Sequence, residues 1–317
     1  MLHCLILIMS VSAAAFCGAA HAQEFPARPV RIVTSAVGGA TDLVARLIAQ
    51  GLTSSLGQQV IVDNRPTGII PGEIVVAAPP DGYTLLFHGS SLWMMPLLQK
   101  VPFDPVKDLA PITLASSTPS LVVVHPAVPA KSLKELIALA KAKPGGLNYG
   151  SGTSGSSSHL AAELFKYMAK VDMVRIGYKG SGPAVNDLIS GQVQLMFPTT
   201  GAALPHVRSN RLRALAVTSL ERTALAPGLP TVAESGLPGY ESLVVYGLLA
   251  PAKTPAAIIA RLHAEVAQGL KTPAISERLF NTGVEVVASS PSDLARTMQK
   301  EMADLGKLMK DTRLRAN

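Results

Sequence analysis

The sequence has 317 residues, 48% of them hydrophobic, and its 28 Lys and Arg against 21 Asp and Glu give a formal net charge of +7. Lys and Arg are scattered and aromatic residues make up only 4%, which argues against a nucleic-acid-binding protein and favours electrostatic steering of a small anion. The two cysteines, Cys4 and Cys17, lie near the N-terminus, so the rest of the chain excludes cysteine catalysis, thiolate metal sites and disulfides.

The N-terminal segment is typical of a secretory signal peptide. Residues 2–16 are almost wholly apolar, and Ala20-His21-Ala22 is a small-x-small cleavage pattern. We therefore expect residues 1–22 to be removed and the mature protein to be exported. A lipoprotein signal at Cys17 fits less well, because Phe16 is bulky where that signal needs a small residue. No later apolar run reaches the roughly 18 to 20 residues of a membrane span.

Strand-like and helical segments alternate along the remaining chain. The expected strands are 30–34, 59–63, 83–87, 121–124, one around Tyr149, 173–178, 193–197, 213–218, 243–250 and 284–287. The expected helices are 41–56, 73–78, 132–142, 157–170, 183–190, 255–270, 273–280 and 292–309. This alternation is typical of parallel sheets flanked by helices. The Pro-rich segments 102–111 and 227–238 are interpreted as crossovers, because apolar residues are interleaved with their prolines.

The order of elements predicts two α/β domains, each a mainly parallel sheet flanked by helices. We expect a discontinuous domain 1 (residues 23–122 plus 222–317), to which the final helices return, and a domain 2 at 123–221. The chain would then cross between domains near residues 123 and 221, and closure would be a rotation about these two crossovers. Ligands of such sheets bind beyond the carboxyl ends of the strands, so the cleft should lie between the domains.

The most distinctive segment is NYGSGTSGSSSH at residues 148–159. Residues 150–158 are only glycine, serine and threonine, and they lie between an expected strand and an expected helix. Glycines allow close backbone approach, hydroxyls donate hydrogen bonds, and a helix N-terminus carries about half a positive charge. The segment therefore predicts an anion cradle. A flexible turn is the alternative, although ordering so many small residues costs entropy unless a ligand or packing compensates.

The same segment matches the dinucleotide-binding pattern G-x-G-x-x-G through Gly150, Gly152 and Gly155. The next expected strand, however, ends in Tyr178-Lys179-Gly180 and not in the Asp or Glu that would hold a ribose. An exported enzyme, or a dinucleotide-binding oxidoreductase using Gly150 to Gly155, is kept as the alternative to a binding protein.

Other catalytic or metal-binding patterns are missing from the sequence. Residues 152–156 end in serine where a G-x-S-x-G nucleophile elbow needs glycine. The histidines after the signal show no metal-ligand spacing, and His159 with Glu163 is interpreted as a surface pair one helical turn apart. We expect no catalytic residue, no metal and no cofactor.

A second strand-to-helix loop of similar character is TSAVGGATD at residues 34–42. Gly38 and Gly39 allow close backbone approach, and Thr41 or Asp42 can cap the following helix. For Asp42 we favour capping over ligand contact. Two such loops on two domains predict the facing walls of one cleft.

A series of short motifs runs through the whole chain after the signal. The motifs are FPARPVRIV at 25–33, GGATD at 38–42, LGQQVIVDNRP at 56–66, DGYTLL at 81–86, NYGSG at 148–152, HLA at 159–161, YKG at 178–180 and GLLAP at 247–251. Together they resemble the Bug-type family of solute receptors for tripartite tricarboxylate transporters.

The resemblance implies a type II-like periplasmic binding protein, in which two α/β domains close like a Venus flytrap on a small organic carboxylate. Such a receptor presents its ligand to cognate membrane transporter subunits, and we expect it to be a monomer. The ligand-binding residues expected from the motifs and the loops are Ser35, Gly38, Gly39, Thr41, Asp42, Ser90, Gly152, Thr153, Gly155, Ser156, Ser157, Tyr178, Lys179, Gly180 and Thr199.

The chain departs from the family pattern at positions that border the cleft. Ser35-Ala36 and Val37 replace a proline-aromatic pair and a proline, and residues 67–70 are shorter than the usual glycine-rich stretch. Gly177 replaces a proline, and Pro198 replaces an acidic or amide residue. The choice between di- and tricarboxylates, aromatic acids and acidic amino acids therefore stays open. Because Pro198 removes an acid that would meet an ammonium group, we favour a ligand without an amine.

Overall fold

The computed structural model describes residues 25–37, 40–65 and 68–312, so the expected signal segment lies outside the described residues. The strands are β1 Val30–Thr34, β2 Val60–Asn64, β3 Thr84–Gly89, β4 Leu109–Pro119, β5 Leu121–Val124, β6 Asn148–Ser151, β7 Val174–Gly177, β8 Leu195–Met196, β9 Arg213–Val217, β10 Leu243–Pro251 and β11 Glu285–Val286. The helices are α2 Ala40–Leu56, α3 Ile70–Val76, α4 Ser91–Leu98, α5 Leu133–Ala142, α6 Ser157–Ala169, α7 Ser181–Ile189, α8 Thr200–Arg208, α9 Ala256–Leu270, α10 Pro273–Asn281 and α11 Pro291–Thr312.

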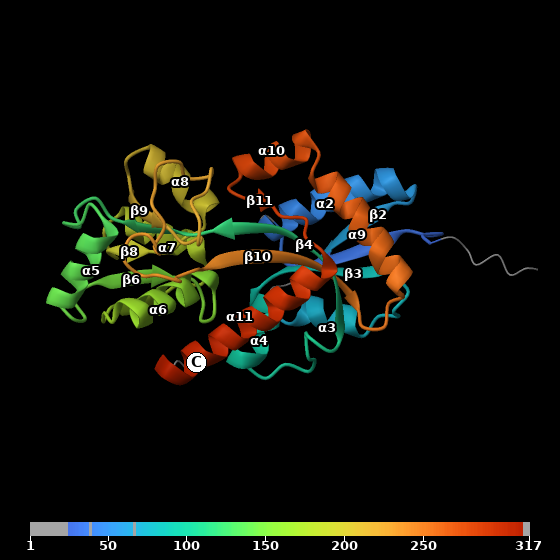
Figure 1. The fold of residues 1–317 in the computed structure, drawn as a ribbon, viewed down its shortest axis with the longest axis horizontal. Coiled ribbons are helices and arrows are strands. Elements are labelled where there is room, and N and C mark those ends of the chain that lie inside the picture. Colours follow the sequence, from blue (N-terminus) through green and yellow to red (C-terminus); the bar gives the residue numbers. More distant parts are fainter. Residues whose placement is uncertain (1–24, 38–39, 66–67, 313–317) are drawn as a thin grey trace, which may run out of the picture.

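These elements form two α/β bodies, which confirms the predicted architecture (Figure 1). The first body contains a six-stranded sheet of order β11-β4-β10-β3-β1-β2, and the second a five-stranded sheet of order β7-β6-β8-β5-β9. None of the helices in the described part of the chain has the length and apolarity of a membrane span.

Helices cover both faces of each sheet, because successive residues of a strand point to opposite faces. In the first body, Ile32 and Phe87 pack in the core under α2 and α9, whereas Val33 and Leu86 pack in the core under α3, α4 and α11. In the second body, α5 and α6 cover one face, and α7 and α8 cover the other.

The strand directions differ from the expected mainly parallel sheets. In the first sheet β1 is parallel to β2 and β3, but β10 is antiparallel to β3 and β4, and β4 is antiparallel to β11. In the second sheet β6 is parallel to β7 and β8, whereas β5 is antiparallel to β8 and β9. Antiparallel pairs arise where the chain leaves one body through β4 and returns through β10. Both sheets are therefore mixed.

The chain passes between the sheets at two neighbouring points. β4 ends at Pro119 and β5 begins at Leu121, so the outward crossing is at Ser120. On the return, the N–H of Ser242 donates to the carbonyl of Thr218 at 2.9 Å, one residue before β10 begins. The domain boundaries expected at 122/123 and 221/222 stay a prediction. The positions of these two crossings are the observations that bear on it.

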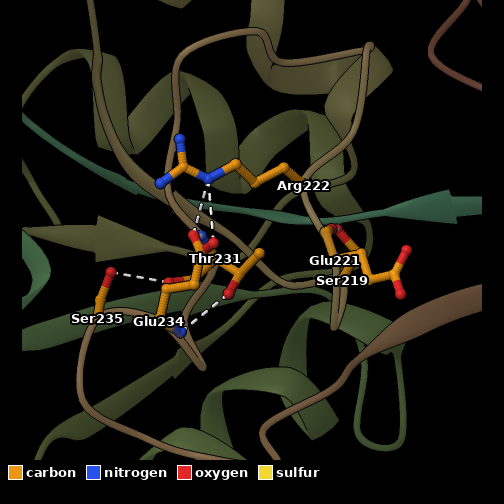
Figure 2. Close-up of polar contacts among 6 residues, drawn as sticks. All are labelled: Ser219, Glu221, Arg222, Thr231, Glu234 and Ser235. Carbon is orange, nitrogen blue, oxygen red and sulfur yellow. Dashed lines mark hydrogen bonds and ion pairs between the residues drawn. The ribbon is translucent and has the colours of Figure 1, made fainter.

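The segment between β9 and β10 packs on the second body. Val232, Leu237 and Tyr240 belong to the core under α5 and α6. Figure 2 shows polar contacts that order this segment, including the ion pair between Arg222 and Glu234 at 2.9 Å. The interpretation of residues 227–238 as a crossover is therefore incomplete, because part of this segment contributes to the core of the second body.

Candidate functional site

Three helix N-termini meet at the carboxyl edge of the second sheet. Helices α6, α7 and α8 follow the neighbouring strands β6, β7 and β8, and their N-cap residues are Ser156, Gly180 and Thr199. All three caps have extended backbone and make no side-chain capping bond. Their first N–H groups therefore need acceptors from elsewhere, and their partial positive charges favour an anion.

Helix α6 offers the most complete set of such donors. The N–H of Ser156 donates to the carbonyl of Thr153 at 3.0 Å, and that of Leu160 donates to the carbonyl of Ser156 at 2.9 Å. Hydrogen bonds among the described residues leave the N–H groups of the intervening residues 157–159 without an acceptor. These groups are the donors that the predicted cradle requires.

The loop before α6 is held by side chains of the helix itself. The Oγ of Ser158 accepts from the N–H of Gly152, and the Nδ1 of His159 accepts from the N–H of Gly155, each at 3.1 Å. Gly155 has a φ of +77°, and a Cβ at this position would lie 2.4 Å from a methyl carbon of Leu98 in α4. The N–H groups of Gly152 and Gly155 are thus used within the loop, and Gly155 has to be glycine for both backbone and steric reasons.

Arg175 in β7 is a further brace that the sequence analysis missed. Its Nε donates to the Oγ of Ser151 at 2.8 Å, and its terminal nitrogen donates to the carbonyl of Gly152 at 2.9 Å. The guanidinium thereby fixes the loop and adds a positive charge beside it. The only sequence signal is an arginine between two apolar residues, Val174 and Ile176, of a short strand.

His159 and Glu163 do not form the expected surface pair. Both are buried, because this face of α6 packs on the second sheet. Glu163 accepts hydrogen bonds from the hydroxyl of Tyr149 and from Lys166. Burial, helped by the positive charge of Arg175, lowers the pKa of His159 to about 4. The imidazole is therefore neutral at ordinary pH, as its role as an acceptor for Gly155 requires.

We expect acid to destabilise the protein through His159. Its pKa falls from 6.5 to about 4 on folding, so its contribution to stability is complete above pH 6.5 and is lost as the pH falls towards 4. Between pH 7 and 4.5 the loss should be roughly 2 to 3 kcal/mol. Denaturant unfolding of the wild type and of His159→Gln, whose amide does not titrate, measures it. Equal losses in the two proteins would contradict this role.

The second predicted loop, residues 34–42, is tied to β2 and α2 of the first body. Gly38 and Gly39 lie outside the described residues. The Nδ2 of Asn64 donates both to the carbonyl of Ser35 and to the Oδ1 of Asp42, at 2.8 Å each. The buried Asp42 also pairs with Arg46 at 3.0 Å. Asp42 thus holds the loop against its surroundings, and Asn64 is a partner that the sequence analysis missed.

Other predicted residues differ in exposure. The hydroxyl of Tyr178 donates to Asp187 at 2.8 Å, and burial together with this bond raises the pKa of Tyr178 to about 12. Thr153 and Lys179 are exposed, Thr41 and Gly180 are half-buried, and Ser90 is buried just before α4. Contact of any of these residues with a ligand stays a prediction.

A cavity of about 340 Å³ lies between the two bodies, beside the loop that precedes α6. Residues of α4, β4, β10 and α11 line it from the first body, and residues of α6 line it from the second. Two of the predicted ligand-binding residues, Ser90 and Ser157, are in its wall. The described structure thus places the N-terminus of α6 beside a partly open space of ligand size.

The bodies also touch at the start of α8. The carbonyl of Gly283, in the turn between α10 and β11, accepts from the Oγ1 of Thr200 at 2.8 Å and from the Oγ1 of Thr118 at 3.0 Å. Gly283 has a φ of +82°, and a Cβ there would lie 2.5 Å from the backbone nitrogen of Gly201. The first turn of α8 therefore fits directly against a glycine of the other body.

Comparisons with known proteins bear on this site. Residues 44–314 match the family described as tripartite tricarboxylate transporter family receptor. BugT of Bordetella pertussis (strain Tohama I) is 35% identical, over 92% of this chain and 91% of its own. Among solved structures, Rpa4515 of R. palustris with adipate is 35% identical with a TM-score of 0.79, covering 90% of this chain and 98% of that one. MatC of Rhodopseudomonas palustris with bound malate is 32% identical with a TM-score of 0.76, covering 90% and 99%.

Proposed function

Because this chain belongs to the tripartite tricarboxylate transporter receptor family, we propose that it is a periplasmic receptor that captures a small organic carboxylate and delivers it to a membrane transporter of that type. The family membership confirms the resemblance seen in the motifs. Relatives of the same fold that hold adipate and malate support a carboxylate as the ligand class. Export with removal of residues 1–22 and a monomeric state are part of the proposal.

The observation that carries the proposal is the set of N–H groups at residues 157–159 that have no acceptor among the described residues, with Ser157 in the wall of the cavity between the bodies. A carboxylate supplies the charge and the lone pairs that these donors lack. Charge-assisted hydrogen bonds are worth about 1.5 to 3 kcal/mol each, so three of them supply roughly 4.5 to 9 kcal/mol before association costs are subtracted.

We propose that the protein binds without turnover. The candidate base beside the loop that precedes α6 is His159 in the first turn of the helix, whose Nδ1 already accepts the N–H of Gly155. Incubating the protein with a pool of carboxylates, followed by mass spectrometry of the free and the retained acids, tests this. The receptor should retain a member of the pool unchanged. Conversion of any member would instead support the alternative of an exported enzyme.

Replacing Ser156 and Ser157 together by alanine should weaken carboxylate binding. Each hydroxyl bond lost to a ligand carboxylate removes about 1 to 3 kcal/mol, while the backbone donors stay in place. Ser156 makes no side-chain capping bond, so the double variant should unfold at nearly the wild-type denaturant concentration. Calorimetric titration and denaturant unfolding measure the two effects. Unchanged affinity with lowered stability would mean that these hydroxyls are only structural.

A further inference from the structure

The cavity between the bodies has a wall that is more apolar than a carboxylate group needs. Leu160 and Leu164 of α6, Leu305 and Leu308 of α11 and Met94 of α4 all line it. The same side chains form a small cluster that joins the two bodies. Its volume of about 340 Å³ lies within the range of sites that enclose a whole small molecule. The wall is therefore suited to the hydrocarbon part of a ligand.

One face of α6 combines this wall with the anion-binding end. Ser157, Leu160 and Leu164 are spaced at i, i+3 and i+7, so they lie along the same side of the helix, and all three line the cavity. Ser157 is the first residue of α6, next to the unpaired N–H groups. A ligand whose carboxylate is held there has an apolar surface beside the rest of its body.

The charged groups of the cavity wall are mainly acidic. Glu241, Glu301 and Asp304 line it. Lys300, the one basic residue in the described wall, has its Nζ 2.9 Å from Asp304 and 3.9 Å from Glu241. Glu301 accepts a hydrogen bond from the Nε1 of Trp93 at 2.7 Å, and burial raises the pKa of Glu301 to about 7. A second carboxylate on the ligand would meet acids and a lysine that already has two acidic neighbours.

We propose that this cavity takes the apolar body of a monocarboxylate, and that the protein selects such acids over dicarboxylates of the same length. The inference rests on the proposed function, because it requires that the carboxylate is held at the start of α6.

Calorimetric titration of the wild type with acetate, butyrate, hexanoate, octanoate and adipate tests the inference. Affinity should rise by about fourfold for each methylene buried, until the cavity is full. Adipate should bind at least about tenfold more weakly than hexanoate, because its second carboxylate loses hydration beside acids.

Two variants locate the effect. Leu164→Trp should fill the cavity and thereby remove the dependence of affinity on chain length. Leu139→Trp is the matched control, because Leu139 is a half-buried leucine of α5 that does not line the cavity. Glu301→Gln keeps a hydrogen-bond acceptor for Trp93 and should raise the affinity for adipate towards that for hexanoate. This second variant tests the inference even if Leu164→Trp does not fold.

The outcomes separate the inference from the proposed function. If carboxylates bind with an affinity that is independent of chain length, or if adipate binds as tightly as hexanoate, the inference is wrong and the proposed function stands. A second outcome is that the wild type follows the expected series while a correctly folded Leu164→Trp shows the same dependence of affinity on chain length. In that case the apolar site lies elsewhere and the inference is equally wrong. If none of these five acids binds, the inference is wrong, and the retention of another acid from the wider pool of carboxylates decides the proposed function.

Discussion

Replacing Ser157 by aspartate should abolish carboxylate binding while leaving the protein at least as stable as the wild type. Ser157 is the first residue of α6, where a negative charge interacts favourably with the helix dipole and adds about 0.3 to 1 kcal/mol of stability. The same charge would occupy the donors meant for the ligand and repel it. At a separation of about 4 Å the repulsion is roughly 4 kcal/mol near a protein surface, so affinity should fall by at least about a hundredfold.

The control adds the same charge to another helix N-terminus. Ala256 is the exposed first residue of α9, which lies on the side of the first body away from α6 (Figure 1). Ala256→Asp should leave carboxylate affinity unchanged. Calorimetric titration and denaturant unfolding of both variants give affinity and stability separately. If Ser157→Asp binds within tenfold of the wild type, the carboxylate is not held at the start of α6.

Replacing Gly283 by alanine should force the two bodies apart at α8 and weaken ligand binding. The φ of +82° costs a residue with a Cβ about 1 kcal/mol, and the added Cβ would lie 2.5 Å from the backbone nitrogen of Gly201. Backbone atoms have no alternative rotamer, so α8 has to move and Thr200 loses its bond to the carbonyl of Gly283. A receptor that binds its ligand between the bodies should then lose at least about tenfold in affinity.

Gly228 provides a matched control for the backbone strain. It has a φ of +83°, but a Cβ there would meet nothing within 4 Å. Gly228→Ala should therefore lose stability only by the amount of the backbone strain, and its affinity for the ligand should equal that of the wild type. Small-angle scattering at saturating ligand should show a larger radius of gyration for Gly283→Ala than for Gly228→Ala. Equal radii and equal affinities would show that closure does not depend on this contact.

The elements that the sequence predicted are those with clear periodicity and few breakers. Helix α2 and strand β1 are found within one residue of their expected bounds. The elements that it missed are α4, β4 and α8, which contain Pro96, Pro111 and Pro205. Proline normally interrupts helices and central strands, so local rules argued against all three. Tertiary packing overrides them, since β4 pairs along its length with β10.

The candidate site was predictable only where its chemistry is local. The small residues before α6 and the start of α6 near Ser157 follow from sequence patterns of strands, turns and helix starts. The braces by Arg175 and Asn64 depend on neighbouring strands brought together by the fold. The cavity depends on α11, which is far along the chain from α6, and no pattern of spacing links the two helices.

A crystal structure of the protein with its tightest-binding carboxylate tests the central claim most directly. The account predicts that the carboxylate oxygens lie within hydrogen-bonding distance of the N–H groups of residues 157–159, between the two bodies. A carboxylate found on any other surface, or in the cavity but turned away from the start of α6, would contradict it.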